Sequence, residues 1–373
     1  MAKTFSDLGI KNQFIKGLKE LNIKIPTDIQ EQAIPTLLKN NTDFIGLAQT
    51  GTGKTAAYGL PILQNIDPKR DEVQALILAP TRELVQQIQK QLFKFTKYGE
   101  AKIFSEGIYG GEKMDIQLKR IQRTTHIIVA TPGRLLDFIE RGEINIKNIN
   151  TLVLDEADEM LSMGFKQDLN KILKFTTGTR HTWLFSATFP EDIASMINTY
   201  MHKDAVTVEI NKNSLVNANI SHHYIVTSVK EKVNIISRLL DKYNEDRGII
   251  FTRTKAGAMQ LTEKLKAEGF SVDALQGDMQ QKERDKVMRA FKNESLQYLI
   301  STDVSARGID VNNLAFIIHH QLPDQQEYYT HRSGRTARAG KTGESIALII
   351  SGEEQEVQKL QKDLDIKFKQ ITL

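Results

Sequence analysis

The chain has 373 residues, of which 40% are hydrophobic and 26% are charged; this mixture excludes global disorder and favours two domains of ordinary size. It contains no cysteine, which excludes disulfides and cysteine-ligated zinc and fits a reducing compartment. The N-terminus lacks the apolar core of a signal peptide and no apolar run is long enough to cross a bilayer, so we expect a soluble, cytoplasmic protein. The net charge of +4 is compatible with a polyanionic partner but does not by itself indicate one.

Short apolar runs alternate with helical patterns along nearly the whole chain. Runs of this length, rich in aliphatic residues and followed by polar or turn residues, are typical of strands in a parallel sheet buried on both faces. They predict strands at residues 44–47, 75–78, 126–129, 151–154 and 183–185, and again at 248–251, 298–300, 315–318 and 346–350. Amphipathic helices lie between them, so the pattern predicts two α/β domains.

A glycine-rich loop follows the first predicted strand directly. It reads Ala48-Gln49-Thr50-Gly51-Thr52-Gly53-Lys54-Thr55 and precedes a helical stretch, which is the setting of a phosphate-binding loop. The glycines let backbone amides approach phosphate oxygens, Lys54 supplies positive charge to the β- and γ-phosphates, and the Thr55 hydroxyl is suited to hold Mg²⁺. Ala48 stands where the strict pattern has glycine, and an ordinary glycine-rich turn is the alternative.

Two adjacent carboxylates, Asp155 and Glu156, follow the predicted strand at 151–154. With a phosphate loop upstream, we expect Asp155 to orient Mg²⁺, partly through water, and Glu156 to polarise the attacking water. The alternative is a helix start, where acidic residues suit the helix dipole. The motifs together predict a Mg²⁺-dependent ATP hydrolase.

The two predicted domains join near residues 208 to 219, where the sequence is polar and has no clear period. We expect an N-terminal domain at 1–208, a linker at 209–219 and a C-terminal domain at 220–373. Within the second, Arg332, Arg335 and Arg338 are spaced three apart and would line one side of a helix. They would form either a solvated basic face or a pair of arginine fingers, Arg335 and Arg338, that reach the γ-phosphate.

These motifs, in this order, resemble the DEAD-box RNA helicases, whose namesake tetrapeptide is Asp155-Glu156-Ala157-Asp158. The resemblance spans residues 5 to about 350. The other segments that carry it are Pro26 to Gln30, Pro80 to Leu84, Gly110-Gly111, Thr131 to Arg134, Ser186-Ala187-Thr188, Ile250 to Thr254, Gln281 to Arg284, Ser301 to Asp303 and Arg307 to Asp310. The resemblance implies two tandem RecA-like domains, each a mostly parallel sheet flanked by helices, with ATP and Mg²⁺ as cofactors and RNA as partner.

The resemblance also implies roles for single residues. Thr27 and Gln30, with Phe5 upstream, are expected to read the adenine; Asp310 is expected to meet the ribose, and Ser186 and Thr188 to couple hydrolysis to RNA. Hydroxyls, glycine amides and guanidiniums suit phosphates and sugars better than bases, so RNA binding should read sequence poorly. The residues expected to line the RNA path are Thr81, Arg82, Gly111, Thr131, Gly133, Arg134, Arg253, Gly277 and Thr302.

Five positions depart from the family pattern, and the first two, Asn22-Ile23, stand where a glycine–aromatic pair is usual. Ile23 stands where an aromatic residue usually stacks on adenine, which predicts weaker ATP binding, and Gln276 replaces a common histidine. Ser333 and Ala337 replace an isoleucine and a glycine beside the arginines. Residues 353–373 are expected to form a solvated helix and a short tail.

The sequence thus predicts an RNA-dependent ATPase that closes on ATP and RNA in a cleft across two domains and locally unwinds short duplexes or remodels RNA–protein complexes. Two alternatives remain at this point. One is an ATPase that moves along DNA, and the other is an ATP-gated RNA clamp within a larger complex with accessory proteins.

Overall fold

The computed structural model describes residues 3–39, 41–49, 51–176, 180–210, 219–306, 311, 314–337 and 341–373. The chain forms two compact units, Met1–Asn211 and Lys212–Leu373. Most of the predicted linker, residues 211–218, lies outside the described residues, and so do Thr50, Asp310 and Arg338. The two units are described separately below.

In the first unit, strands and helices alternate from residue 44 onward, after two initial helices. Its strands are β1 (Phe44–Leu47), β2 (Ala75–Leu78), β3 (Ser105–Ile108), β4 (Ile127–Ala130), β5 (Thr151–Asp155), β6 (His181–Ser186) and β7 (Val206–Glu209). Its helices are α1 (Asn12–Glu20), α2 (Asp28–Leu37), α3 (Lys54–Asn65), α4 (Arg82–Phe95), α5 (Met114–Ile121), α6 (Pro132–Glu140), α7 (Ala157–Ser162), α8 (Lys166–Phe175) and α9 (Glu191–Tyr200).

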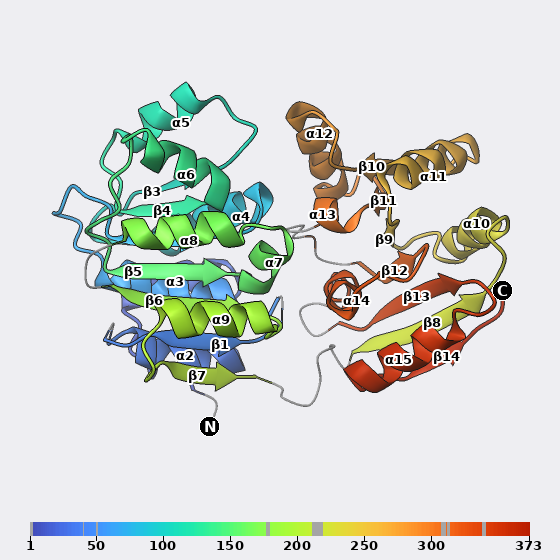
Figure 1. Ribbon diagram of the computed structural model, residues 1–373, viewed down its shortest axis with the longest axis horizontal. Helices are drawn as coiled ribbons and strands as arrows, with labels where there is room; N and C mark the ends of the chain where they lie inside the picture. The colour runs from blue at the N-terminus through green and yellow to red at the C-terminus, as the bar shows by residue number, and fades with distance from the viewer. Residues whose placement is uncertain are drawn as a thin grey trace. The chain divides into compact units, whose positions relative to one another are not determined.

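These strands form one parallel sheet in the order β3-β4-β2-β5-β6-β1-β7, with helices on both faces (Figure 1). Successive residues of a strand point to opposite faces, so each central strand supplies two cores. Ile77 and Val153 pack with α1 to α4, whereas Leu76 and Leu154 pack with α6 to α9. Burial on both faces explains why the central strands read as continuous apolar runs.

The second unit repeats this scheme. Its strands are β8 (Ile220–Val226), β9 (Gly248–Phe251), β10 (Val272–Leu275), β11 (Tyr298–Ser301), β12 (Phe316–His319), β13 (Gly343–Ile349) and β14 (Phe368–Gln370). Its helices are α10 (Lys232–Lys242), α11 (Lys255–Ala267), α12 (Gln281–Lys292), α13 (Asp303–Ala306), α14 (Gln326–Ser333) and α15 (Glu354–Leu364).

The strand order of the second sheet is β10-β11-β9-β12-β13-β8-β14, again parallel. When seven is subtracted from each number, this order is identical to that of the first sheet. The two units therefore share one topology, and strands in equivalent places can be compared directly. The prediction of two α/β domains built on parallel sheets is confirmed.

The C-terminal segment differs from the expectation of a solvated helix and tail. Helix α15 buries Val357, Leu360 and Leu364 against the second unit's core, and residues 368–370 add strand β14 to the sheet edge beside β8. The apolar residues of α15 recur at three- and four-residue spacing, which places them on one packed face. Among the described residues, no helix combines the length and the apolar character needed to span a membrane.

Candidate active site

The phosphate-loop sequence joins β1 to α3, as predicted. Gly51 and Gly53 adopt φ values of +82° and +87°, a left-handed conformation that favours glycine. A Cβ at Gly53 would lie 2.3 Å from the Gln30 Nε2 atom, so no larger residue fits there without a shift. Lys54 begins α3, is 6% exposed, and donates from Nζ to the Ala48 carbonyl 2.9 Å away. A buried cation and a helix N-terminus thus meet at this loop, an arrangement that favours anion binding.

Thr27 and Gln30 bind this loop through their side chains. The Thr27 hydroxyl donates to the Thr52 carbonyl at 2.8 Å, and Gln30 Nε2 donates to the Gly53 carbonyl at 2.9 Å. The two residues also form a capping box at the start of α2, in which the Thr27 backbone N–H donates to Gln30 Oε1 at 3.1 Å. The motif predicted to read the base is therefore attached to the loop predicted to hold the phosphates. Its contact with adenine stays a prediction.

Phe5 lies in the hydrophobic core of the first unit and is 2% exposed. Ile23 packs against the same core and is partly buried. Phe5 thus belongs to the same core as Ile29 of α2, and a direct contact between Phe5 and the base stays a prediction.

Asp155 ends β5 and is 3% exposed. Its Oδ2 accepts a hydrogen bond from the Tyr58 hydroxyl at 2.8 Å, and its Oδ1 accepts one from the Glu156 backbone N–H at 3.1 Å. Burial raises the pKa of Asp155, while the positive charge of Lys54 and the Tyr58 hydrogen bond act in the opposite direction. The same burial, together with Asp155, raises the pKa of the Tyr58 hydroxyl well above its ordinary value, so Tyr58 remains a donor.

Glu156 occupies a strained turn between β5 and α7. Its φ and ψ are 51° and 53°, in the left-handed region that non-glycine residues seldom adopt. Glu156 is the N-cap residue of α7, but its side chain makes no capping hydrogen bond. A helix does begin directly after Glu156, as the helix-start alternative predicts. Strain at one residue between a buried strand and a helix is in addition typical of functional sites.

Asp158 joins the end of β5 to the loop that follows β6. Its Oδ2 accepts the backbone N–H of Ala187 at 3.2 Å, and both the N–H and the hydroxyl of Thr188 at 2.9 Å each. Ser186 donates from Oγ to the Thr188 carbonyl at 2.7 Å, which closes the loop on itself. The Ser186 to Thr188 motif is therefore held by the last residue of the Asp155 to Asp158 motif.

The RNA-motif residues of the first unit follow β2, β3 and β4, which are neighbours in the sheet. Because neighbouring parallel strands all point the same way, residues that follow them lie together at the carboxyl ends of the strands. Arg82 donates from Nη1 to the Gly110 carbonyl at 3.1 Å, and a Cβ at Gly111 would lie 2.4 Å from the same Nη1 atom. Gly111 also has φ +87°, so conformation and space both require glycine.

Four further RNA-motif residues stand near the starts of helices. Thr81 is the N-cap of α4, where its Oγ1 accepts the Leu84 backbone N–H at 3.2 Å. Thr131 is the N-cap of α6 and Gly133 lies in that helix's first turn, whereas Arg134 donates from Nη1 to the Glu112 carbonyl at 3.0 Å. The capping role possible for such residues is present at Thr81, alongside any role in RNA binding.

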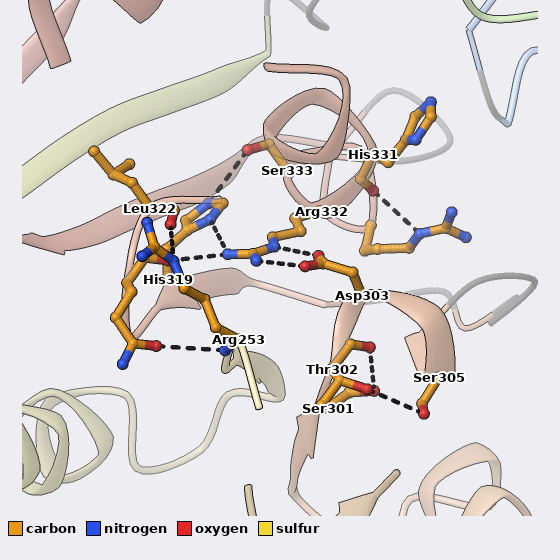
Figure 2. Close-up of polar contacts among 12 residues, drawn as sticks. Arg253, Ser301, Thr302, Asp303, Ser305, His319, Leu322, His331, Arg332 and Ser333 are labelled. Atoms are coloured by element: carbon orange, nitrogen blue, oxygen red, sulfur yellow. Dashed lines mark hydrogen bonds and ion pairs between the residues drawn. The ribbon is translucent and has the colours of Figure 1, made fainter. Parts of the chain in front are cut away.

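The RNA-motif residues of the second unit occupy equivalent places. Arg253, Gly277 and Thr302 follow β9, β10 and β11, the neighbouring strands that correspond to β2, β3 and β4. Figure 2 shows Arg253 donating from Nε to the Leu322 carbonyl at 2.9 Å and Thr302 bonded to Ser305 at 3.1 Å. The structure thus places the predicted residues, six in the first unit and three in the second, after the ends of three equivalent neighbouring strands.

The expectation that the three arginines line one helix face is wrong. Helix α14 ends at Ser333, with Gly334 as its C-cap, so Arg335 lies beyond the helix and does not continue the face of Arg332. Arg332 is 2% exposed and forms a two-point ion pair with Asp303, with N–O distances of 2.5 and 2.7 Å (Figure 2). Arg335 is 6% exposed and donates from Nε to the His331 carbonyl at 3.2 Å. Both described arginines are buried, so they form no solvated basic face.

Sequence reasoning missed Tyr58, Asp158 and Asp303 as site residues. Asp158 lies within a motif that was recognised, but its partners are 29 and 30 residues away in the chain. Tyr58 and Asp155 are 97 residues apart, and Asp303 and Arg332 are 29 apart. No local pattern pairs residues at such separations, and only the shared sheet edge brings them together.

Comparison with known proteins gives the family. Residues 27–196 match the model described as DEAD/DEAH box helicase, and residues 231–340 match the helicase conserved C-terminal domain. The DEAD-box ATP-dependent RNA helicase CshA of Geobacillus kaustophilus is similar to this chain, with 38% identity over 359 residues that cover 96% of this chain and 76% of that protein.

Solved structures agree with these matches. Saccharomyces cerevisiae Dbp5 bound to RNA and ADP BeF3 is similar with a TM-score of 0.91 and 32% identity, over 99% of this chain and 96% of that one. A variant of the same yeast protein bound to Gle1 gives a TM-score of 0.81 at 32% identity, over 100% of this chain and 95% of that one. The chain therefore belongs to the DEAD-box ATP-dependent RNA helicases, ATP-hydrolysing enzymes, and its two α/β units are RecA-like domains.

Proposed function

We propose that this helicase binds RNA by its backbone, with little sequence preference, and opens short duplexes or remodels RNA–protein complexes locally. The observation that carries the proposal is that, in the first unit, two groups of predicted residues follow two separate groups of neighbouring strands. In the first unit, phosphate-loop and carboxylate residues follow β1, β5 and β6, whereas RNA-motif residues follow β2, β3 and β4. In the sheet order these are two separate groups of neighbours, so ATP and RNA can bind one edge together.

The residues near the phosphate loop fit Mg²⁺. Asp155 and Thr55 supply a carboxylate and a hydroxyl, the hard oxygen ligands that Mg²⁺ prefers, beside the Lys54 cation. Among the described residues, no group of three or more His, Cys, Asp or Glu side chains could hold a metal. In the proposal, Mg²⁺ is bound by one carboxylate, nucleotide phosphates and water. When bound, the ion would neutralise charge on the β- and γ-phosphates.

Each catalytic residue then has a defined task in the proposal. Lys54 and the glycine amides hold the phosphates, and Glu156 polarises the attacking water. Arg335 comes from the second unit and stabilises charge that develops on the γ-phosphate, an effect worth about 10³ to 10⁵ in turnover. Hydrolysis would therefore depend on ATP and RNA binding both units together. Arg338 shares this role in the proposal but lies outside the described residues.

Energetics favour local over processive opening. Separating a base-pair step costs about 1.4 kcal/mol, so a few steps cost an amount that one closure of the two units can supply. Discrimination between RNA sequences would come from outside these backbone contacts. Accessory proteins are part of the proposal because a similar yeast protein is bound to Gle1. A cytoplasmic location is also proposed, since a chain without cysteine suits a reducing compartment.

The test is strand separation of RNA duplexes of one turn and of several turns, under single-turnover conditions with the purified chain and ATP. We expect the short duplex to open at a rate that depends on ATP, and the long duplex to remain closed. Glu156→Gln serves as a control that retains the nucleotide site but lacks the carboxylate that activates water. Efficient opening of the long duplex without another factor would contradict local unwinding.

A further inference from the structure

The Tyr58 hydroxyl contacts a side chain that the proposed function assigns to Mg²⁺. Tyr58 lies in α3, one turn after the phosphate loop, and is fully buried. It donates to Asp155 Oδ2 at 2.8 Å. One phenolic oxygen therefore connects the helix after the phosphate loop to the carboxylate at the end of β5.

This contact fixes the orientation of the Asp155 carboxylate. The torsion that turns a carboxylate about its last bond is broad and weakly restricted in the absence of partners. Here Oδ1 accepts the Glu156 N–H at 3.1 Å while Oδ2 accepts Tyr58, so each oxygen is held from a different element. The carboxylate plane cannot rotate without breaking one of these two bonds, both charge-assisted.

Tyr58 is itself immobile. Its ring centroid lies 5.2 Å from that of Phe185, which precedes Ser186 in β6, and the ring is enclosed in the core of the first unit. A phenylalanine would fill the same space and keep the same ring contact. The hydroxyl is the only atom that such a change removes, so its effect can be separated from packing.

We propose that Tyr58 is a positioning residue that sets the Asp155 carboxylate for Mg²⁺-bound ATP. The inference rests on the proposed use of Asp155 as a magnesium ligand. Removing a residue that holds a metal ligand in place by a hydrogen bond typically lowers metal affinity or activity about 10- to 100-fold.

The test uses the full chain with Tyr58→Phe and a fluorescent ATP analogue. Binding is titrated with Mg²⁺ at fixed nucleotide, and again with nucleotide in excess EDTA. We expect the half-saturating Mg²⁺ concentration to rise about tenfold, while affinity in EDTA stays at the wild-type value. In steady-state ATP hydrolysis, the KM for Mg-ATP should rise more than kcat falls.

Tyr243→Phe provides a matched control. Tyr243 is a buried tyrosine of the second unit whose hydroxyl donates to Glu344 Oε2 at 2.6 Å, so the change also deletes one tyrosine–carboxylate bond. It should leave the Mg²⁺ midpoint unchanged. Thermal unfolding of all three proteins, followed by circular dichroism for both units and by the fluorescence of Trp183 in β6 for the first unit, records any loss of fold.

The outcomes separate the inference from the function on which it rests. An unchanged Mg²⁺ midpoint in Tyr58→Phe would overturn the positioning role, and so would an equal loss of affinity with and without Mg²⁺. If the wild-type chain itself failed to bind the nucleotide more tightly with Mg²⁺, the proposed magnesium site would be wrong, and the inference with it. A selective rise in the midpoint of Tyr58→Phe alone would support it.

Discussion

Asp158 accepts two hydrogen bonds from Thr188, one from the backbone N–H and one from the hydroxyl, each 2.9 Å long. Both end on Oδ2, while Oδ1 accepts the Glu159 backbone N–H at 3.1 Å. Asp158 lies three residues after Asp155 and is 6% exposed. A movement of the loop after β6 would therefore be transmitted through one carboxylate to the start of α7 and the catalytic turn.

Replacing Asp158 by asparagine should uncouple unwinding from hydrolysis. The asparagine NH₂ group is a donor, so it must face backbone N–H donors either at Glu159 or at Thr188, and the hydrogen bond on that side is lost. A hydrogen bond to a charged group is worth about 1.5–3 kcal/mol. We expect RNA strand separation to fall at least about tenfold, with the KM for ATP near the wild-type value. Rates of ATP hydrolysis and strand separation are measured on the same preparation. Equal losses of both rates would contradict the coupling role.

Arg335→Ala should abolish stimulation by RNA while leaving nucleotide binding intact. Loss of an arginine finger costs about 10³-fold or more in turnover, because only the transition state carries the charge that it stabilises. ATP hydrolysis with saturating RNA and equilibrium binding of an ATP analogue distinguish the two effects. Arg335→Lys, which keeps the charge without the planar guanidinium, is the control and should recover little activity. If ATP binding collapsed in Arg335→Ala, the assignment would be wrong.

Arg332, in contrast, should matter for stability. It is buried and bidentate to Asp303, and its guanidinium lies 5.2 Å from the Phe251 ring centroid. Arg332→Met leaves the Asp303 carboxylate without this partner, and loss of one member of a buried ion pair costs about 3–5 kcal/mol. Urea unfolding followed by circular dichroism should show the loss.

Two controls confine that effect to the second unit. The chain's one tryptophan, Trp183, lies in the first unit, so its fluorescence transition should be unchanged by Arg332→Met. Lys97→Ala removes the pair between Lys97 and Glu20, both exposed, and should cost little because exposed ion pairs contribute little to stability. A first-unit transition that shifted as much as the second would show that Arg332 does not act locally.

His222 predicts a pH dependence of the second unit. Its Nδ1 is 2.6 Å from the Tyr329 hydroxyl, and burial, followed by the charge of His223, lowers the pKa of His222 to about 4. An unfolded histidine has a pKa of about 6.5, so the unfolded state binds this proton first as the pH falls. The stability that neutral His222 contributes to the folded state is complete above pH 6.5. It is lost as the pH falls to about 4, and the total loss is up to about 3 kcal/mol.

The measurement is the free energy of unfolding of the second unit between pH 7 and pH 4. His222→Phe should be less stable at pH 7 and should lose less stability on acidification, by up to one proton's slope, about 1.4 kcal/mol per pH unit. Buried His319 also has a lowered pKa, from burial first and then from the charges of Arg332 and His222, so a residual slope is expected in the variant. An identical slope in both proteins would contradict the assignment to His222.

The sequence predicted every inner strand except β8, and it missed all four edge strands. The edge strands are β3, β7, β10 and β14, and none was expected. Strand β7 is mostly exposed and β14 consists of Phe368, Lys369 and Gln370, so neither has the continuous apolar run of a strand buried on both faces. Strand β8, beside β14, was missed because its two histidines and serine interrupt the apolar pattern.

In the candidate site, features built from adjacent residues could be predicted, and contacts between residues far apart in the chain could not. The phosphate loop could be predicted because strand, glycines, lysine and helix are adjacent in the chain, and Gly51 and Gly53 adopt the conformations that this loop requires. The arginine spacing was misleading because a periodic pattern says nothing of where a helix ends, and α14 ends before Arg335. The partners Tyr58 and Asp155 come together only through the order of β1, β5 and β6 in the sheet.

The most direct test of the central claim is ATP hydrolysis by the purified chain without nucleic acid, with single-stranded RNA and with single-stranded DNA of the same sequence. A parallel series with GTP tests whether Thr27 and Gln30 select the base. The account predicts slow hydrolysis alone, strong stimulation by RNA and not by DNA, and preference for ATP. Equal stimulation by DNA, or hydrolysis that is fast without nucleic acid, would contradict it.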